Sequence, residues 1–361
     1  MGGRIDDPHR QVREPVFQPL GDRAHPLRLL PLVRREEDDL RHLGRSRPPK
    51  GGPSLKVCRV HGPILRLHRP MRIKMREPHP PPMRLLVASA ADPASVTQRE
   101  ALLRLASWEE AGNFRGSRVL RHGDFVLVTI EDLHLFHDHV DREARDRFGE
   151  SPEVVVFLSK HRSESATPSL TVHPIGNFGP AKYGGRAETL VPTAPAFMTE
   201  VLRTVRREAD GLGYAVTFEA THHGPVLDAP SFFIEAGSTE KEWRDASAAE
   251  ALMRALLSAE PRPSPVAVGV GGGHYVPRLT DVAISREVAF GHLVAGYAIP
   301  FLSEAMIDQV IGQTPGASVV YFHRKAVEKA TLRDLEARFA ERGLRSVHEE
   351  DLPPRSPKQS Y

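Results

Sequence analysis

Short apolar runs alternate with segments of helical spacing from Met83 to about residue 342. The run 154–158 is rich in β-branched residues, which is typical of a strand buried on both faces. The segment 240–257 carries apolar residues at steps of three and four, which indicates an amphipathic helix. Strands alternating with helices predict an α/β fold, namely a three-layer α/β sandwich with a mostly parallel sheet and helices on both faces.

The same periodicities assign the other elements. Strands are expected at 85–89, 125–130, 154–158, 214–219, 232–235, 266–270 and 318–322, with a further apolar segment at 294–299. Helices are expected at 92–105, 194–208, 240–257, 303–312 and 325–342. The stretch 161–193 is polar and rich in glycine, so we expect a long loop there, and long loops are often functional.

Residues 1–82 differ in composition from the rest of the chain. They carry a net charge of +9 and 14 of the 32 prolines, whereas the remaining residues carry a net charge of −6. Because Pro and Arg interrupt every short apolar run, we expect this segment to be largely disordered. We interpret it as a dispensable extension or a start codon assigned too far upstream, with a basic RNA-binding arm as the alternative. Residues 83–350 are then expected to form one catalytic α/β domain, and 351–361 a flexible tail.

The composition excludes several classes of protein. Cys58 is the single cysteine in the sequence, which excludes an intramolecular disulfide, a cysteine-based zinc finger and a four-cysteine iron–sulfur centre. No apolar run approaches the roughly 18–20 residues of a membrane span, and the N-terminus lacks the apolar centre of a secretory signal. We therefore expect a soluble, cytoplasmic protein. Because the body is acidic, any RNA contact there requires a local basic patch.

Polar side chains gather where the predicted strands end. In open α/β sheets, ligands bind outside the carboxyl ends of the strands. The strands ending near 158, 219, 235, 270 and 322 deliver His, Glu or Arg to this edge: His161, Glu219, His222, His223, Glu235, His274, His323 and Arg324. Each residue alone has an ordinary structural explanation, so the convergence is what predicts an active site.

Individual positions add detail to this prediction. Glu235 ends an apolar run, so its carboxylate is expected to be semi-buried and to need a partner. His274 follows three glycines, which can adopt backbone conformations that other residues strongly disfavour. His222 and His223 are adjacent, so in an extended strand only one of them would face the site unless the chain has already turned.

The glycine loop and the other histidines allow more than one interpretation. Residues 271–273 either offer amides to a phosphate or an oxyanion, or form a tight turn. A dinucleotide-binding loop is disfavoured, because Pro277 and a polar stretch follow where a helix is required. The histidine-rich stretch 134–139 has ligand-like spacing but is interpreted as a solvated helix start. His173 in the long loop and His292 are further candidates.

The pattern favours metal-assisted hydrolysis. The sequence lacks a Gly-x-Ser-x-Gly elbow, a Walker A loop and a His-Glu-x-x-His helix. His and Glu are abundant at one edge and no nucleophile stands out. Neutral imidazoles with a carboxylate can hold zinc and leave a position for water, whose pKa zinc lowers toward about 7.

Five longer motifs occur along the body in the order Ser159-Lys160-His161-Arg162-Ser163, His173-Pro174-x-Gly176-Asn177, Glu219-Ala220-Thr221-His222-His223-Gly224-Pro225, Phe233-Ile234-Glu235-x-Gly237-Ser238-Thr239-Glu240-x-Glu242-Trp243 and Gly271-Gly272-Gly273-His274-Tyr275-x-Pro277-Arg278. Together they resemble the archaeal and plant-type D-aminoacyl-tRNA deacylase family. The resemblance runs from residue 83 to about 344 and leaves out 1–82.

The resemblance implies an enzyme that hydrolyses the ester between a D-amino acid and the 3′ end of tRNA, releasing both in translation quality control. It implies a zinc requirement, with one or two Zn²⁺ per chain, and a fold similar to phosphorylases and peptidyl-tRNA hydrolases. The expected partner is tRNA charged with a D-amino acid, and we expect a monomer without membrane contact.

The motifs locate the site but leave the zinc ligands open among these histidines and glutamates. Under the resemblance we assign catalysis to His161, His274, Glu219 and Glu235, and metal binding to His173, His222 and His223. The tRNA acceptor end is assigned to Lys160, Arg162, Lys182, Arg186, Gly271, Gly272, Gly273 and Arg278. The alternatives are metal-free catalysis with His161 or His274 as general base and help from an RNA 2′-hydroxyl, a non-catalytic RNA-binding module, and a zinc peptidase or amidohydrolase.

Overall fold

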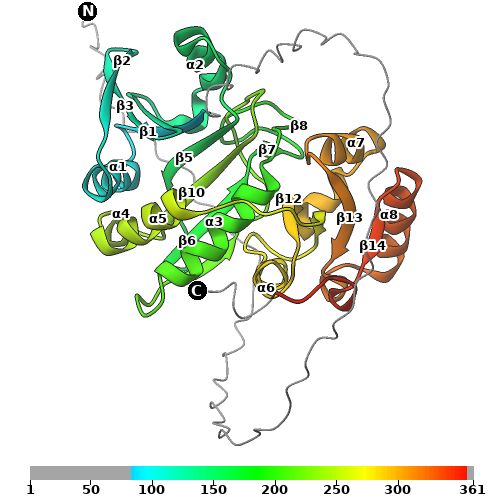
Figure 1. The fold of residues 1–361 in the computed structure, drawn as a ribbon. Helices are drawn as coiled ribbons and strands as arrows, with labels where there is room; N and C mark the ends of the chain where they lie inside the picture. Colours follow the sequence, from blue (N-terminus) through cyan, green and yellow to red (C-terminus); the bar gives the residue numbers. More distant parts are fainter. Residues whose placement is uncertain (1–82, 356–361) are drawn as a thin grey trace, which may run out of the picture. The chain divides into compact units, whose positions relative to one another are not determined.

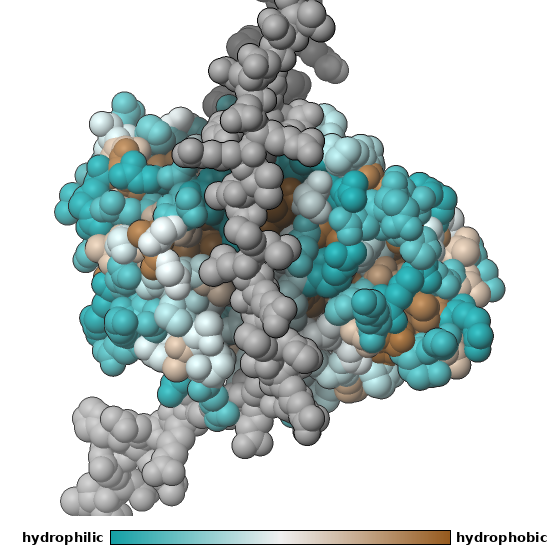
Figure 2. Space-filling view, turned by 90° about the horizontal axis from the view of Figure 1, so that it is seen from below, coloured by the Kyte–Doolittle hydropathy of each residue, from teal (hydrophilic) through white to brown (hydrophobic). Residues whose placement is uncertain are grey.

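The computed structural model describes residues 83–355. The expectations for 1–82 and for the end of the predicted tail, 356–361, lie outside the described residues. Within 83–355, no helix is long and apolar enough to cross a membrane. The described surface in Figure 2 is mostly hydrophilic with scattered apolar patches.

Eight strands form a mixed sheet in the order β2-β3-β4-β1-β5-β10-β6-β9. Their bounds are β1 Arg84–Ser89, β2 Glu109–Phe114, β3 Ser117–His122, β4 Phe125–Ile130, β5 Val154–Lys160, β6 Ser169–Pro174, β9 Ala215–Phe218 and β10 Ser231–Gly237. Neighbours are parallel except in the pairs β2–β3, β3–β4 and β6–β10. The central strands β1, β5 and β10 are buried along almost their whole length.

A second sheet contains four parallel strands in the order β12-β11-β13-β14. Its strands are β11 Val266–Val270, β12 Ala289–Val294, β13 Ala317–Phe322 and β14 Arg345–Val347. A short antiparallel pair, β7 Gly176–Asn177 with β8 Thr189–Leu190, lies outside both sheets. The expected α/β class with mostly parallel strands is confirmed. The strands divide between two sheets, because an apolar run identifies a strand but does not identify the strand it pairs with.

Helices cover both faces of each sheet. Helices α1 Pro93–Leu105, α3 Pro195–Glu208, α4 Glu240–Trp243 and α5 Ala246–Ser258 lie on one side of the large sheet, and α2 Val140–Phe148 lies on the other (Figure 1). In the second sheet, α6 Pro277–Ser285 packs on one face, while α7 Glu304–Gly312 and α8 Lys329–Glu341 pack on the opposite face. Helix α3 contacts strands of both sheets, so one apolar core is continuous between them.

Capping residues set the helix boundaries. Asp92 accepts hydrogen bonds from the amides of Ala94 and Ser95, and Pro93 stands in the first turn of α1. The helix expected at 240–257 is two helices, because Asp245 breaks it and caps α5. The apolar periodicity of the sequence continues through Asp245, so the periodicity alone does not reveal the break between the two helices.

Several expectations about local structure were wrong. The expected loop 161–193 contains β6, which is buried throughout. A helix does follow the glycine loop, since α6 begins at Pro277, and proline suits the first helical turn where its missing N–H costs nothing. The apolar segment 294–299 holds the end of β12 and a 3₁₀ helix, η2 Gly296–Phe301.

The chain remains bound to the body as far as Arg355, five residues past the expected boundary. The Glu287 amide donates to the Pro353 carbonyl at 2.8 Å. The Arg355 side chain is buried and lies 3.6 Å from Glu200 Oε2 and 3.6 Å from Glu287 Oε1. These ion pairs fix the start of the segment that the sequence pattern assigns to a flexible tail.

Candidate active site

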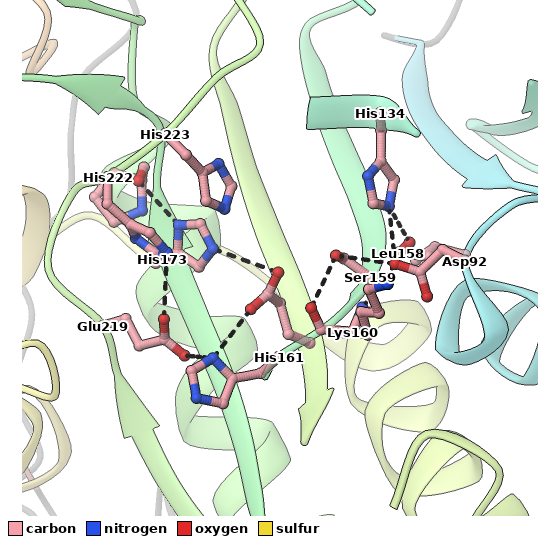
Figure 3. A network of polar contacts seen from close by, with 12 residues as sticks. Asp92, His134, Leu158, Ser159, Lys160, His161, His173, Glu219, His222 and His223 are labelled. Carbon is pink, nitrogen blue, oxygen red and sulfur yellow. Dashed lines mark hydrogen bonds and ion pairs between the residues drawn. The ribbon is translucent and has the colours of Figure 1, made fainter. Parts of the chain in front are cut away.

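The seven residues predicted for catalysis and metal binding lie in one cluster of buried and half-buried side chains. Figure 3 labels five of them, namely His161, His173, Glu219, His222 and His223. They come from strands or strand ends of both sheets: His161 follows β5, His173 lies in β6, Glu235 lies in β10, Glu219, His222 and His223 follow β9, and His274 follows β11. The convergence expected at the carboxyl ends of the strands is therefore present, and the cluster joins the two sheets.

Strand register places Glu235 and His173 on the same face of the large sheet. Phe233 pairs with His173, and Glu235 pairs with Thr171, two residues along each strand. Because side chains alternate between faces, residues two apart point the same way. The His173 ring stacks on Phe233 with 5.1 Å between centroids and an interplanar angle of 2°. A core strand, and not a loop, thus positions His173.

The segment after β9 connects the two sheets through backbone hydrogen bonds. The Ala220 amide donates to the His274 carbonyl at 2.9 Å, and the Thr221 amide donates to Leu293 in β12 at 2.8 Å. On the other side, the Gly176 amide donates to the His223 carbonyl at 2.9 Å. These bonds hold the histidines that follow β9 between the glycine loop and the end of β6.

His222 and His223 both reach the cluster, although an extended strand would allow only one of them. His223 has a φ of 43°, so the chain has already turned at this residue. The His173 ring lies 4.2 Å from the His222 ring and 4.9 Å from the His223 ring, measured between centroids. The turn makes a compact group of three imidazoles.

Glu219 is the centre of the other half of the cluster. It is fully buried, and its carboxylate lies 3.0 Å from His161 Nδ1, 2.9 Å from His274 Nε2 and 3.5 Å from His222 Nε2. Burial alone would raise the pKa of Glu219, but His161 and His274 outweigh it and hold the pKa well below its usual value. Glu219 is therefore ionised at neutral pH.

Glu235 is a second buried carboxylate, 3.6 Å from both His161 and His173. Burial opposes its charge, yet these two histidines lower the pKa of Glu235 to about 2. In return, and against burial, the carboxylates raise the pKa of His161 well above its usual value and raise the pKa of His173. In the metal-free protein, two ionised carboxylates thus face two imidazoles whose protonated forms they favour.

His222 and His223 form the neutral part of the cluster. Burial, reinforced by nearby histidines, lowers the pKa of His222 well below its usual value and that of His223 to about 3. Their Nδ1 atoms lie 2.9 Å from the Ala220 carbonyl and 2.6 Å from the Gly224 carbonyl. Each Nδ1–H can donate to its carbonyl, which leaves Nε2 as a ligand atom, the tautomer that metal-binding histidines commonly adopt.

The donor set fits a divalent cation that prefers nitrogen and oxygen ligands. Three groups of side chains place their ligand atoms within 4.8 Å of one another: His173, His222 and His223; His161, Glu219 and His274; and His173, Glu219 and Glu235. His173 Nε2 and both Glu219 oxygens are buried without a partner in hydrogen-bonding geometry. Buried polar atoms without such a partner are costly, and imidazole and carboxylate donors suit zinc.

A pocket of about 230 Å³ opens onto His222 and His223. One wall is the 176–183 stretch, which includes Lys182, and the other is η2. The first wall is held in place by Asn177, whose side-chain amide donates to the Gly184 carbonyl at 3.0 Å and to the Arg186 carbonyl at 3.3 Å. The cluster is therefore accessible to a substrate from this side.

The remaining residues assigned to tRNA binding are scattered. Lys182 lines the pocket and Arg186 is exposed in the same loop. Lys160 Nζ lies 5.3 Å from the centre of the Trp243 ring, and exposed Arg162 lines another groove beside Trp243.

Arg278 and the glycine loop 271–273, which were also assigned to tRNA binding, make contacts within the fold. Arg278 forms an ion pair with Glu349 and a hydrogen bond to the Tyr321 hydroxyl. The Gly271 amide donates to the Val294 carbonyl at 2.8 Å, so it cannot serve an oxyanion, whereas within residues 83–355 no backbone hydrogen bond engages the Gly272 and Gly273 amides in this way. The glycine loop thus acts first as a link between β11 and β12.

Two histidine predictions need correction. His134 and His137, interpreted as part of a solvated helix start, are buried at 1% and 5% exposure. His134 Nε2 lies 2.9 Å from the Leu158 carbonyl, away from the cluster. His292 is fully buried behind the site, with Nδ1 at 3.1 Å from Thr221 Oγ1, and supports the segment that carries His222.

The assignments drawn from the motifs missed three aromatic residues. Tyr275 Oη lies 2.7 Å from His161 Nε2, and its position directly after His274 was the available signal. Tyr297 and Phe301 line the pocket, 47% and 44% exposed. Their sequence segment reads as an ordinary apolar element, so no pattern marks them as part of a site.

Comparisons with known proteins cover the whole cluster. The family model for D-aminoacyl-tRNA deacylase matches residues 148–347. The D-aminoacyl-tRNA deacylases of Thermoplasma acidophilum and Methanosarcina mazei are each 36% identical, over 72% and 74% of this chain and 96% and 92% of theirs. That of Pyrococcus furiosus is 34% identical over 73% of this chain and 99% of its own. The crystal structure of a conserved protein of unknown function aligns with a TM-score of 0.70 and 30% identity, over 76% of this chain and 98% of that one. The chain therefore belongs to the D-aminoacyl-tRNA deacylase family.

Proposed function

We propose that this chain hydrolyses the ester bond of D-aminoacyl-tRNA and releases the free D-amino acid and tRNA, using a water molecule activated at the histidine–carboxylate cluster. The observation that carries the proposal is the cluster itself: seven buried or half-buried His and Glu side chains from two sheets, next to a pocket, in a chain of this family. Because the substrate is charged tRNA, the proposal places the protein in the cytoplasm.

The proposal includes zinc, held by His173, His222 and His223. Their ligand atoms lie within 4.8 Å of one another, and the tautomers of His222 and His223 leave Nε2 available. Zinc, when bound, supplies Lewis acidity that polarises the ester carbonyl and lowers the pKa of water. Binding requires neutral imidazoles, and because the carboxylates raise the pKa of His173, protons would compete with the metal for this residue.

His274 is suited to accept the proton of the attacking water. It is only partly buried, and its Nε2 lies 2.9 Å from Glu219. An ionised carboxylate at this position accepts from Nε2–H and orients the imidazole, so that Nδ1, an atom buried within the cluster, is the proton acceptor. Glu219 thus acts by positioning His274.

His161 is suited to return a proton to the departing 3′-oxygen of the tRNA. The flanking carboxylates keep His161 protonated, and its Nε2 lies 2.7 Å from the Tyr275 hydroxyl. A proton passing from Nε2 through this hydroxyl to the leaving oxygen completes the reaction. The water oxygen ends in the carboxyl group of the amino acid, and the tRNA regains its 3′-hydroxyl.

The test is deacylation of tRNA charged with a D-amino acid and, separately, with its L-enantiomer, by the full chain. We expect turnover of the D-substrate, loss of turnover after chelation and its return with Zn²⁺. His274→Ala should lose most turnover while retaining tRNA binding. Tight binding of tRNA without turnover of the D-substrate would overturn the proposal and leave an RNA-binding module. Full activity in chelator would overturn the zinc assignment and favour metal-free catalysis.

A further inference from the structure

We infer that the pocket beside His222 and His223 binds an unstacked nucleobase of an RNA 3′ end against the rings of Tyr297 and Phe301. This inference rests on the proposed function and deepens it, because it names the part of the substrate that the pocket takes.

The Tyr297 and Phe301 rings come from the same short 3₁₀ helix, η2, at the mouth of the pocket. Tyr297 and Phe301 both lie on η2 and are 47% and 44% exposed. Among the exposed large hydrophobic side chains of 83–355, they are two of the three aromatic ones. Tyr183 and Phe178 contribute to the opposite wall, so aromatic surface faces the pocket from two separate elements.

The walls are fixed before any ligand arrives. The Phe301 ring lies so close to Gly179 that a Cβ at Gly179 would stand 2.8 Å from it. The Gly296 amide at the start of η2 donates to the Gly272 carbonyl at 2.8 Å, which ties this wall to the loop that carries His274. A ligand therefore meets a preformed surface and loses less free energy to ordering.

The chemistry of the pocket matches a nucleobase with an attached phosphate. Proteins recognise single-stranded RNA ends by stacking splayed bases on aromatic rings, with basic side chains near the backbone. Here exposed Lys182 lines the pocket and exposed Arg186 follows in the same loop. Partial burial and the Glu219 charge raise the pKa of Tyr297 to about 12, so its hydroxyl remains a hydrogen-bond donor near neutral pH.

The position of the pocket selects the terminal base. His222 and His223 line the pocket and also belong to the cluster, so the reacting ester must lie next to whatever occupies the pocket. In aminoacyl-tRNA the ester is carried by the ribose of the last nucleotide. Stacking of that nucleotide's base on Tyr297 and Phe301 would hold its ribose, and hence the ester, at the cluster.

The experiment uses uncharged tRNA whose terminal adenosine is replaced by 2-aminopurine, a fluorescent adenine isomer that is quenched when it stacks. We expect the full-length protein to quench the fluorescence. Tyr297→Leu and Phe301→Leu should each reduce the quench and weaken binding roughly fivefold or more, in line with the loss of one base–aromatic stack. The matched control is Phe136→Leu, since Phe136 is an aromatic residue 61% exposed outside the pocket lining, and it should behave as the wild type.

A second arm removes the terminal nucleotide from the tRNA. The shortened tRNA should bind the wild type at least as weakly as full-length tRNA binds Tyr297→Leu. Tyr297→Leu should bind the shortened tRNA almost as well as the wild type does, which demonstrates coupling between the ring and the base. Unchanged quenching in both variants, or fully additive losses, would overturn the inference. Because uncharged tRNA is used, this result is independent of whether the chain deacylates its proposed substrate.

Discussion

Figure 3 contains two buried groups of histidine and carboxylate that differ in how their polar atoms are satisfied. In the first, around Asp92 and His134, backbone groups supply the partners of the Asp92 carboxylate and of His134 Nε2. Asp92 accepts from the amides of Ala94, Ser95 and Lys160, and His134 Nε2 lies 2.9 Å from the Leu158 carbonyl, whereas His134 Nδ1 is buried without a hydrogen-bond partner within 83–355. In the second, Glu219 and Glu235 face the rings of histidines, and both Glu219 oxygens lack a partner in hydrogen-bonding geometry among the described residues.

The comparison shows that burial of ionisable side chains does not by itself indicate catalysis. Burial lowers the pKa of His134, so this histidine is neutral and acts as a structural hydrogen-bonding group. In the other group, carboxylates overcome burial and raise the pKa of His161. The backbone satisfies the carboxylate of the first group, whereas the charges of the second group are directed at one another, as expected where pKa values are strongly perturbed.

The largest effect is expected for Glu219→Gln. Its carboxylate lies within 3.5 Å of three histidines, so the amide would remove the charge that orients them. Turnover of D-aminoacyl-tRNA should fall about 10²- to 10⁴-fold, the range for a general acid–base group. Single-turnover deacylation with a parallel tRNA-binding measurement tests this. Turnover within tenfold of the wild type would remove Glu219 from the site.

Asp92→Ala should produce the reverse pattern. The substitution removes the cap of α1 and the acceptor for the Lys160 amide. We expect a loss of about 1–2 kcal/mol in the free energy of unfolding, as for other helix caps, with turnover per folded molecule unchanged. Urea unfolding and kinetics on the same sample check both parts. A selective loss of turnover would mean that the two groups of Figure 3 act together.

The two groups should also differ in how stability depends on pH. The unfolded chain binds a proton on its histidines below about pH 6.5, but folded His134 resists protonation, so its contribution to stability falls as the pH drops below that value. For His161 the sign is opposite. Its pKa is raised on folding, so its contribution is complete below about pH 6.5 and is lost as the pH rises through the folded pKa.

His134→Gln tests this difference. In urea titrations of the metal-free protein, the variant should lose less stability than the wild type between pH 6.5 and 5, by at most about 1.4 kcal/mol per pH unit, the value of one proton. The slope above pH 7 should be unchanged, because the cluster around Glu219 is intact. Identical slopes for the two proteins below pH 6.5 would show that His134 is protonated in the folded state.

The sequence was most informative where chemistry follows directly from strand ends. His161 and Glu235 mark the ends of apolar runs, and three glycines mark His274, so each could be predicted without knowing the tertiary structure. The proline, glycine and asparagine that follow His173 favour a loop at this position, although β6 is a buried strand. The turn-forming residues just past the end of β6 mask the sequence signal of this strand, which is stabilised by pairing with other strands.

Other features depend on contacts that no local pattern contains. Val266–Val270 reads as a buried strand, but its membership of a second sheet follows from pairing with β12 and β13. His134 stands between Leu133 and Leu135 in a stretch that also holds Asp132, His137 and Asp138, so its surroundings in the sequence are mixed, and packing against Phe157 and Phe233 buries it. The aromatic pocket wall on η2 likewise exists only once the two sheets are brought together.

The smallest expected effect separates substrate binding from chemistry. Lys182 lines the pocket and Arg186 is exposed in the same loop, while the cluster around Glu219 lies beneath. If both cations contact phosphates, replacing them with glutamine should raise KM several-fold and reduce the salt dependence of binding by about 0.7–0.9 in slope for each lost contact. The value of kcat should be unchanged, since interactions made equally in ground and transition states affect only KM.

The matched control is Arg278→Gln, which removes a cation paired with Glu349 and should alter stability without changing the salt slope. Steady-state kinetics at several salt concentrations measure all three proteins. A fall in kcat for the double variant would show that the loop also positions the ester, and the division between a binding rim and a reactive cluster would then fail.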